Sequence, residues 1–336
     1  MEYCISICIT SYNRPLQLAR CLNSISTKYS NEIEIVIGDD RSPNWQQISK
    51  VVNDHKQKSP IFTTLIINPE NLGYDLNFYN LINKSNGKYL LFITDDDAFL
   101  LESIDRVIDL LKSEELSVAF TPYFNRENNQ LCRNYPNNLN ICPGIVSVER
   151  HLYNSILLSG LIFRRDSIPK YDPYLFKGLI YSQVFVFICI LFEFGGAYLN
   201  IPLIDYIGDG ENGFGKNAGE DNNSLLANRV HYLSNLEYNK RLVKITKLFD
   251  IRFGTNLYSA VSRTYSIRTI TGLCYARSFG IDALKEYRDA VYSVGFDLGV
   301  LPKIYYSLIR ILGFKLTSKL IRLGKYVHRT MCNLFY

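Results

Sequence analysis

Hydrophobic positions in residues 1–121 follow two alternating patterns. Short apolar runs, several with an apolar residue at every second position, predict strands at residues 3–9, 32–38, 62–67, 88–93 and 116–121. Apolar residues three or four positions apart predict helices between them, beginning at Pro15 and covering residues 46–56, 74–83 and 104–111. Strands that alternate with helices predict βαβ units and a mostly parallel sheet of the α/β class.

The rest of the chain has a less regular pattern. Residues 122–143 are rich in Asn and predict a long irregular connection, whereas residues 159–165 predict one more strand. Residues 184–192 form an apolar run that is too short to span a bilayer and predicts a buried helix. The Gly-, Asn- and Asp-rich residues 208–223 predict a loop, and residues 225–336 predict mainly helices.

Composition and charge narrow the class of protein further. Hydrophobic residues make up 47% of the 336 residues and charged residues 21%, which is typical of a folded globular chain. Eight cysteines occur without a C-x-x-C pair, and only four histidines accompany them, so we expect no zinc site and a reducing cytoplasm. Because the chain opens directly on a strand-like run, we expect no signal peptide.

Polar residues follow each of the first four predicted strands. We call them the strand-end clusters, and they comprise residues 10–14, residues 39–40, residues 68–75 and residues 94–97. Ligands of parallel α/β sheets bind beyond the carboxyl ends of the strands. We therefore expect the four clusters to converge on one rim of the sheet.

The last strand-end cluster contains three successive carboxylates, Asp95, Asp96 and Asp97. They follow an apolar strand and repel one another, so a bound cation would stabilise them. Oxygen ligands next to a phosphate-bearing substrate suit Mg²⁺ or Mn²⁺. A solvated acidic turn is the alternative that needs no metal.

Four motifs in order carry a resemblance to a known family. Residues 5–14 (ISICITSYNR), 35–42 (IVIGDDRS), 71–77 (NLGYDLN) and 87–97 (GKYLLFITDDD) resemble the family-2 glycosyltransferases of the GT-A fold. The likeness is close over residues 1–105 and loose over the next hundred residues.

The resemblance implies a fold and a division into domains. The GT-A fold is a Rossmann-like, mostly parallel sheet flanked by helices, and we expect it over residues 1–224 with a helical C-terminal region over residues 225–336. Within it, residues 1–105 would bind the nucleotide and residues 106–224 the acceptor.

The resemblance also implies roles at a nucleotide-sugar donor. Thr10 and Tyr12 resemble contacts to the base and ribose, and one carboxylate of the pair Asp39 and Asp40 would accept a hydrogen bond from the base. The other residues implied at the donor are Asn13, Arg14, Asn71, Gly73, Asp75, Asn77, Asp95 and Asp96. Two alternatives need no ligand: residues 39–42 as a helix-capping turn, and Asp75 with Asn77 as caps of the helix at 74–83.

Residues 95–97 match the acid motif by which the family binds its metal, and the match leaves two registers open. Either Asp95 and Asp97 are the two acids of the motif, or Thr94 takes the first position and Asp96 is the main ligand. The expected Mn²⁺ or Mg²⁺ would neutralise the diphosphate leaving group.

The acceptor-activating base is harder to place. Inverting members of the family use a carboxylate, often just before the buried helix, where this chain has Gln183. Asp209 and Glu211 in the glycine-rich loop are the substitutes, although both residues also suit ordinary turns.

The spacing Asn-x-Gly-x-Asp-x-Asn-Phe at residues 71–78, with Asp-Asp-Ala at 96–98, looks similar to bacterial O-antigen transferases of the abequosyltransferase type. This likeness implies a lipid-linked saccharide acceptor and a donor sugar such as the deoxyhexoses abequose or rhamnose, or a common hexose. It also implies an enzyme at the cytoplasmic face of the bacterial inner membrane.

The C-terminal tail, residues 301–336, has seven Lys and Arg residues and no acidic one. Interspersed Leu and Ile predict an interfacial helix, which suits peripheral contact with anionic lipids. A solvated helical cap is the alternative. We expect no nucleic-acid partner, because no known binding motif accompanies the charge.

Two other functions use similar residues. A nucleotidyltransferase also places carboxylate-held metal beside a nucleotide, but residues 10–15 lack the glycines of its usual phosphate loop. A carbohydrate-binding protein without catalysis would retain the fold and lack the base, as the residue at 183 allows.

Overall fold

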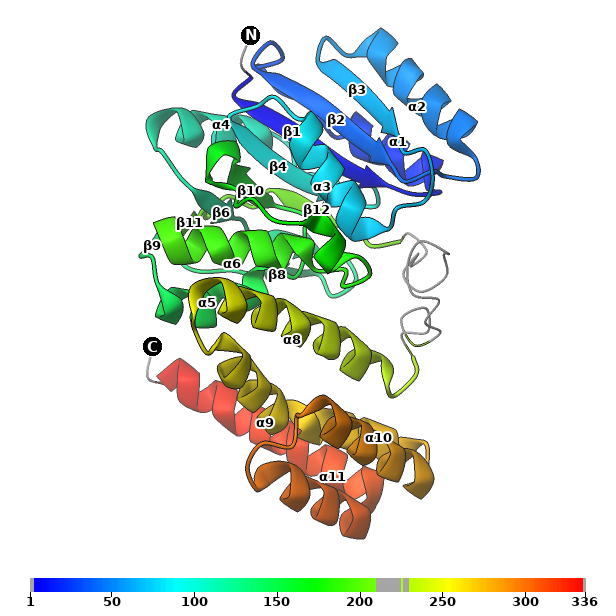
Figure 1. Cartoon of the computed structure of the whole chain (residues 1–336), viewed down its shortest axis with the longest axis vertical. Coiled ribbons are helices and arrows are strands. Elements are labelled where there is room, and N and C mark those ends of the chain that lie inside the picture. The colour runs from blue at the N-terminus through cyan, green and yellow to red at the C-terminus, as the bar shows by residue number, and fades with distance from the viewer. Residues whose placement is uncertain (1–2, 210–224, 226–229, 335–336) are drawn as a thin grey trace. The chain divides into compact units, whose positions relative to one another are not determined.

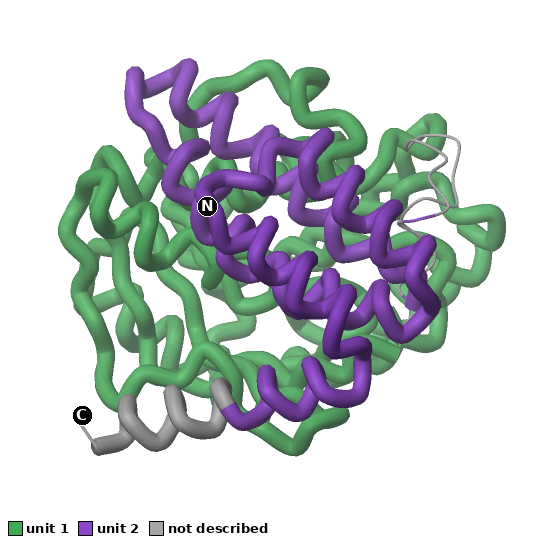
Figure 2. The backbone as a smooth tube through the Cα atoms, turned by 90° about the horizontal axis from the view of Figure 1, so that it is seen from below, with its two compact units in different colours: residues 1–222 green, residues 223–336 purple. Residues whose placement is uncertain are grey.

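The computed structural model describes residues 3–209, 225 and 230–334. Contacts divide the chain into two compact units, residues 1–222 and residues 223–336, which Figure 2 colours separately. Every described strand belongs to the first unit, and the described part of the second unit is helical.

The larger sheet of the first unit has the strand order β3-β2-β1-β4-β10-β6-β11-β9 (Figure 1). Its parallel part consists of β1 (Ile5–Ser11), β2 (Ile33–Asp39), β3 (Phe62–Ile67) and β4 (Tyr89–Thr94). These strands confirm the sequence prediction to within two residues at each end. The next strand, β10 (Leu161–Arg164), runs antiparallel to β4.

The other half of the larger sheet is mixed in direction. The strand β6 (Val118–Phe120) pairs antiparallel with β10 and parallel with β11 (Gly196–Tyr198). At the edge, β9 (Leu139–Ile141) pairs antiparallel with β11. The prediction of a mostly parallel sheet therefore describes the half formed by β1 to β4 better than the other half.

The connection at residues 122–143 was predicted to be irregular, and the structure corrects this. It contains β9 and also β7 (Tyr123–Asn125) and β8 (Gln130–Cys132). Strands β7 and β8 join β5 (Ala98–Phe99) and β12 (Ile204–Tyr206) in a second, four-stranded sheet. Three-residue strands that contain Asn and Gln give too short an apolar alternation to be recognised.

The β5–β12 pair brings distant parts of the chain together. Ala98 lies opposite Asp205 and Phe99 opposite Ile204. The N–H of Leu100 also donates to the carbonyl oxygen of Leu203 at 2.9 Å. The chain therefore leaves the acid triplet and returns beside it after a hundred residues.

Helices cover the larger sheet. The crossover helices are α1 (Pro15–Asn23), α2 (Trp45–Lys58), α3 (Tyr74–Lys84) and α4 (Ser103–Ser113), as the apolar spacing predicts. The predicted buried helix is α6 (Ser182–Phe194), which follows α5 (Ile145–His151).

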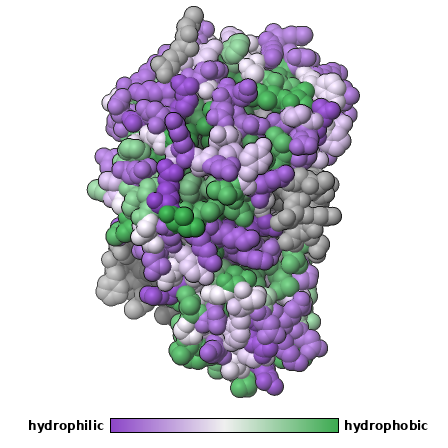
Figure 3. All heavy atoms as spheres, viewed as in Figure 1, coloured by the Kyte–Doolittle hydropathy of each residue, from purple (hydrophilic) through white to green (hydrophobic). Residues whose placement is uncertain are grey.

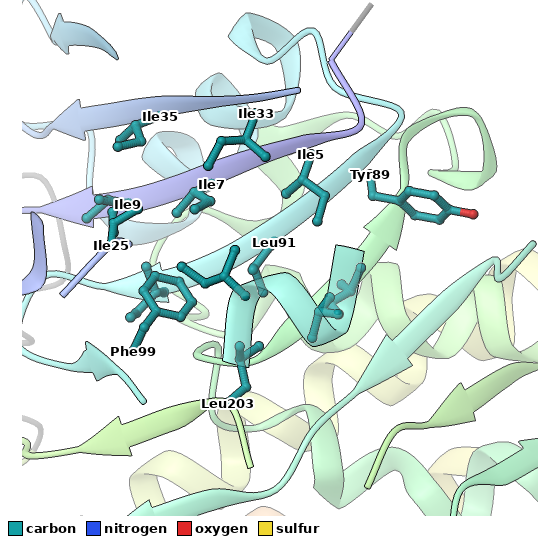
Figure 4. Packing of buried hydrophobic residues seen from close by; sticks show 14 of the residues in the cluster. Ile5, Ile7, Ile9, Ile25, Ile33, Ile35, Tyr89, Leu91, Phe99 and Leu203 are labelled. Carbon is teal, nitrogen blue, oxygen red and sulfur yellow. The ribbon is translucent and has the colours of Figure 1, made fainter. Parts of the chain in front are cut away.

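The apolar core of the first unit holds the strand ends in place. Figure 4 shows side chains of β1 and β2, including Ile7 and Ile35, beside Leu91 of β4 and Phe99 of β5. All are 5% exposed or less. Because β1 is buried along its whole length, its end cannot shift relative to its neighbours without disturbing this packing.

The second unit contains α8 (Ser234–Phe253), α9 (Leu257–Ser278), α10 (Ile281–Val294) and α11 (Leu301–Leu334). Gly313 interrupts α11 with φ 70° and ψ 177°, so the predicted tail helix is two helices in succession. Among the described residues, no helix combines the length and apolarity needed to cross a bilayer.

Candidate active site

The ends of β1 and β4 bring two of the strand-end clusters into contact. The N–H of Asp95 donates to the carbonyl oxygen of Thr10 at 3.2 Å, and the N–H of Tyr12 donates to Asp95 Oδ2 at 3.3 Å. Asn13 has a left-handed backbone (φ 57°), and its N–H donates to Ser42 Oγ at 2.7 Å. The first cluster therefore touches both its neighbours.

Asp40 anchors the third cluster. Its carboxylate is 5% exposed and accepts hydrogen bonds from the N–H groups of Leu72 and Gly73, at 2.8 and 2.9 Å, and from Asn68 Nδ2 at 2.9 Å. Asp39 is fully buried, and its carboxylate accepts hydrogen bonds from Ser42. Residues from all four clusters thus converge on one rim, as predicted, although Asp75 and Asp97 point away from it.

Burial raises the pKa of both carboxyl groups of this pair, while hydrogen bonds to Ser42 and Asn68 oppose the rise. Asp39 closes the turn at residues 39–42. Asp40 fixes the loop that ends where α3 begins, at Gly73, whose φ of 83° suits glycine. Beside it, Asn71 has a buried Oδ1 without a partner among the described residues, so this amide oxygen is available to a ligand.

Asp75 and Asn77, predicted at the donor, instead hold the fold together. Asp75 is 2% exposed and accepts hydrogen bonds from the N–H groups of Ile180 and Ser182, at 2.8 and 3.1 Å, and from Ser182 Oγ at 2.6 Å. Asn77 Nδ2 donates to the carbonyl oxygen of Gly38 at 2.9 Å. Both lie on the inward face of α3, so the structure does not bring them to the rim.

Asp75 gives the unfolding free energy a pH dependence. Burial raises the pKa of Asp75 from 3.8 to about 6, so the folded state binds this proton more tightly than the unfolded state does. The resulting stabilisation is complete below pH 3.8 and is lost as the pH rises through 6. We expect the stability of the wild type relative to Asp75→Asn to fall by about 2 kcal/mol between pH 4.5 and 7.

Urea unfolding of both proteins across this range measures the difference. Asp166→Asn, which changes an exposed carboxylate, is the control and should give a much smaller trend. A difference between wild type and Asp75→Asn that stays constant with pH would contradict the assignment.

The three carboxylates of the acid triplet have different surroundings. Arg14 Nη1 lies 2.9 Å from Asp95 Oδ1 and 3.2 Å from Asp96 Oδ2. Burial raises the pKa of Asp95 to about 7, and this effect outweighs the attraction of Arg14. The side chains of Asp95 and Asp96 are 1% and 15% exposed, so Asp96 is the more accessible of the two.

Asp97, which the sequence predicts among the metal ligands, is bonded inside the protein and does not join its neighbours at the rim. Its carboxylate accepts hydrogen bonds from Ser159 Oγ at 2.6 Å, Thr94 Oγ1 at 3.0 Å and the N–H of Ile207 at 3.1 Å. Burial raises the pKa of Asp97 to about 6. Asp97 therefore ties the segment after β12 to the end of β4.

The protein side chains could hold a metal ion only if the substrate supplied the remaining ligands. Within the part of the chain that the structure describes, no three His, Cys, Asp or Glu side chains are arranged to hold an ion. Mg²⁺ at nucleotides commonly takes one or two carboxylates together with phosphate oxygens. Asp96, with Asp95 beside it, fits that requirement, which favours the register with Asp96 as the main ligand.

Two of the three residues predicted as candidates for the base lie in the described part of the chain. Gln183 is 2% exposed, its Nε2 donates to the carbonyl oxygen of Ile156 at 2.9 Å, and its Oε1 accepts from the Tyr74 hydroxyl at 2.9 Å. An amide that is bonded in this way cannot take a proton from an acceptor. Asp209 is paired with Arg20, which lowers the pKa of its carboxyl group. Glu211 lies outside the described residues.

Sequence reasoning missed Arg20. It lies on α1, where a basic residue between apolar positions suggests only a solvated helix face. Its Nη2 donates to the carbonyl oxygen of Asp96 at 2.8 Å. Its position in the sequence could have indicated it. Helix α1 starts directly after the first cluster, so the side chain of Arg20 stays near the rim.

Comparison with known proteins identifies a family for part of the chain. Residues 6–168 match the family described as glycosyl transferase family 2. An uncharacterized glycosyltransferase of Haemophilus influenzae is 31% identical over 108 residues, which are 32% of this chain and 34% of that protein. The abequosyltransferase RfbV of Salmonella typhimurium is 35% identical over 102 residues, or 30% of each chain. The matches thus span about a third of these relatives.

Solved structures share the fold at low sequence identity. TarS of S. aureus has a TM-score of 0.53 at 14% identity, covering 90% of this chain and 55% of TarS. The mannosyltransferase PcManGT from Pyrobaculum calidifontis, solved with GDP-Man and Mn²⁺, has a TM-score of 0.52 at 11% identity, covering 93% of this chain and 88% of that one. The chain therefore carries, in residues 6–168, a domain of glycosyl transferase family 2 built on the GT-A fold.

Proposed function

We propose that this chain is a glycosyltransferase that moves a sugar from a nucleotide-sugar donor to an acceptor hydroxyl, with Mn²⁺ or Mg²⁺ held at Asp96. The observation that carries the proposal is the convergence of the four strand-end clusters on one rim, with Asp96 at its accessible edge. Two of the solved relatives support the donor class, since TarS was solved with UDP-GlcNAc and PcManGT with GDP-Man and Mn²⁺.

The proposed roles follow the order of the clusters. Thr10, Tyr12 and Asn71 would contact the base and ribose, and Asp40 would hold the loop that covers them. The charge of Arg14 balances Asp95, and Arg14 would lie between the acids and the nucleotide. The bound metal would supply positive charge to the diphosphate as the bond between the sugar and the phosphate breaks. The acceptor oxygen forms the new bond to the sugar and loses its proton.

We further propose a lipid-linked saccharide acceptor in the synthesis of a bacterial surface polysaccharide. Its support is the 35% identity over 102 residues to the abequosyltransferase RfbV. A deoxyhexose donor such as abequose or rhamnose is the matching choice.

A lipid-linked acceptor suits an enzyme at a membrane surface, so we place the C-terminal helix α11 at the cytoplasmic face of the inner membrane. Apolar side chains on α11 are exposed, with Ile304 at 46%, Leu308 at 49% and Ile311 at 80%. Hydrophobic residues lie between hydrophilic ones on the molecular surface (Figure 3). Lys303 and Arg310 flank these residues, a combination that binds anionic lipids.

We expect the double variant Lys303→Gln with Arg310→Gln to bind anionic vesicles about 30-fold more weakly, since each basic residue near such a surface contributes about 1 kcal/mol. Flotation with phosphatidylglycerol vesicles measures the binding. The matched control, Lys240→Gln with Lys285→Gln, removes two charges that already have acidic partners. Equal binding of all three proteins would refute the membrane role.

A screen for release of nucleoside diphosphate tests the catalytic proposal. Nucleotide sugars incubated with the protein and Mn²⁺ should yield nucleoside diphosphate and free sugar slowly, and faster with a suitable acceptor. Release of inorganic diphosphate in a parallel incubation with a nucleoside triphosphate and a sugar phosphate would indicate a nucleotidyltransferase. Binding of donors without any turnover would indicate a carbohydrate-binding protein.

A further inference from the structure

Arg20 carries a charge at the rim that the roles proposed above do not use. Its Nη1 and Nη2 donate to the two carboxylate oxygens of Asp209, each at 2.7 Å. The same Nη2 donates to the backbone carbonyl oxygen of Asp96 at 2.8 Å. The guanidinium group therefore lies directly beside the residue proposed to hold the metal.

A phosphate group can take the place of the Asp209 carboxylate in its pair with Arg20. The planar fork of a guanidinium group matches the two oxygens of a carboxylate and two oxygens of a phosphate equally well. The side chains of Arg20 and Asp209 are 36% and 46% exposed, so they can separate without opening the core. Arg20 also keeps a buried Nε–H without a partner among the described residues, so Asp209 does not satisfy the whole group.

Asp209 lies where its negative charge would repel the diphosphate of the donor. The segment that carries it is held at the acid triplet, because the N–H of Ile207 donates to Asp97 Oδ1 at 3.1 Å. A carboxylate at this place adds negative charge where the diphosphate of the donor would enter. A diphosphate carries more negative charge than one carboxylate and would attract Arg20 more strongly.

We infer that Asp209 is a stand-in anion, which holds Arg20 until the donor binds, and that Arg20 then exchanges this carboxylate for the diphosphate of the donor. The inference rests on the proposed function and adds to it a second basic group for the leaving diphosphate. Asp209 thereby competes with the donor, whereas the sequence prediction made it a candidate proton acceptor. The exchange breaks and forms hydrogen bonds only.

Titration calorimetry with UDP and GDP in the presence of Mn²⁺ tests the exchange on the full chain. Asp209→Asn removes the competing charge and should tighten nucleoside diphosphate binding by about 3- to 10-fold. Arg20→Ala should weaken it at least 10-fold, and Arg20→Lys, which keeps the charge without the fork, should lie between Arg20→Ala and wild type. Adding Asp209→Asn to Arg20→Ala should change nothing further, because both residues act through one guanidinium group.

Controls separate this inference from the function that it assumes. Glu115→Gln removes an exposed partner of Lys88 elsewhere on the unit and should leave binding unchanged. Unchanged or weaker binding by Asp209→Asn would overturn the inference, as would a gain from Asp209→Asn that persists without Arg20. Wild-type affinity together with loss of transfer in Asp209→Asn would make Asp209 the base. If the wild type bound neither nucleotide, the proposed function itself would fail.

Discussion

Asp96→Ala should lower the rate of sugar transfer at least about 1000-fold and leave the fold intact. The reason is that removing a group that organises charge on a leaving oxygen costs several kcal/mol in the transition state. Asp96 is the more accessible of the two carboxylates that lie beside Arg14, and Asp97 is bonded in the interior. Initial rates of nucleoside diphosphate release measure the loss.

Two further measurements decide what Asp96 does. Binding of Mn²⁺ to the UDP-loaded protein should become undetectable in Asp96→Ala, and circular dichroism should match the wild type. Asp97→Asn is the comparison, because its carboxylate is bonded inside the protein. This variant should lose stability and keep Mn²⁺ binding. Full activity of Asp96→Ala, or undiminished wild-type activity in excess chelator, would refute the metal role.

Asp40→Ala should weaken nucleoside diphosphate binding at least about 100-fold. The substitution removes the acceptor of three hydrogen bonds, from Asn68, Leu72 and Gly73. Hydrogen bonds to a charged group contribute about 1.5–3 kcal/mol each, so their loss frees the loop at residues 68–73. The loop must then be ordered again on binding, which reduces affinity.

Calorimetry with UDP and GDP measures this effect as well. Asp40→Asn keeps one acceptor oxygen and should fall between wild type and Asp40→Ala. Asp105→Ala, on α4, removes the acceptor of hydrogen bonds from residues 27 and 28 away from the rim and serves as the control. Wild-type affinity in a folded Asp40→Ala protein would show that the loop does not form the nucleotide site.

Much of the structure of residues 1–105 could be predicted from the sequence because its elements are long and regular. The alternating isoleucines of β1 and β2 are buried together, and a parallel sheet then brings the ends of its strands to one rim. The three-residue strands β7, β8 and β9 contain too few positions to show a period.

Side-chain direction could not be predicted. Asp75 and Asn77 belong to a motif at the rim, yet the phase of α3 turns both inward, onto Ser182 and Gly38. Asp97 contacts Ile207, which is 110 residues away in sequence. Such partners depend on tertiary packing, and the spacing of residues along one strand or helix carries no information about them.

The hydrogen bond between Leu100 and Leu203 holds the two ends of residues 101–202 side by side, so this segment could be replaced by that of another protein. Residues 101–202 begin and end at the adjacent strands β5 and β12. A transplanted segment of different length would have to match these two ends and the pairing of β10 with β4. Strand β4 and the loop at residues 68–73 lie before this segment in sequence. Contacts with the segment are made by Asp75 at Ser182, by Asp97 at Ser159, and by β4 along β10. We propose that grafting this segment as a cassette, with its contacts to β4 and Asp75 preserved, would change acceptor preference.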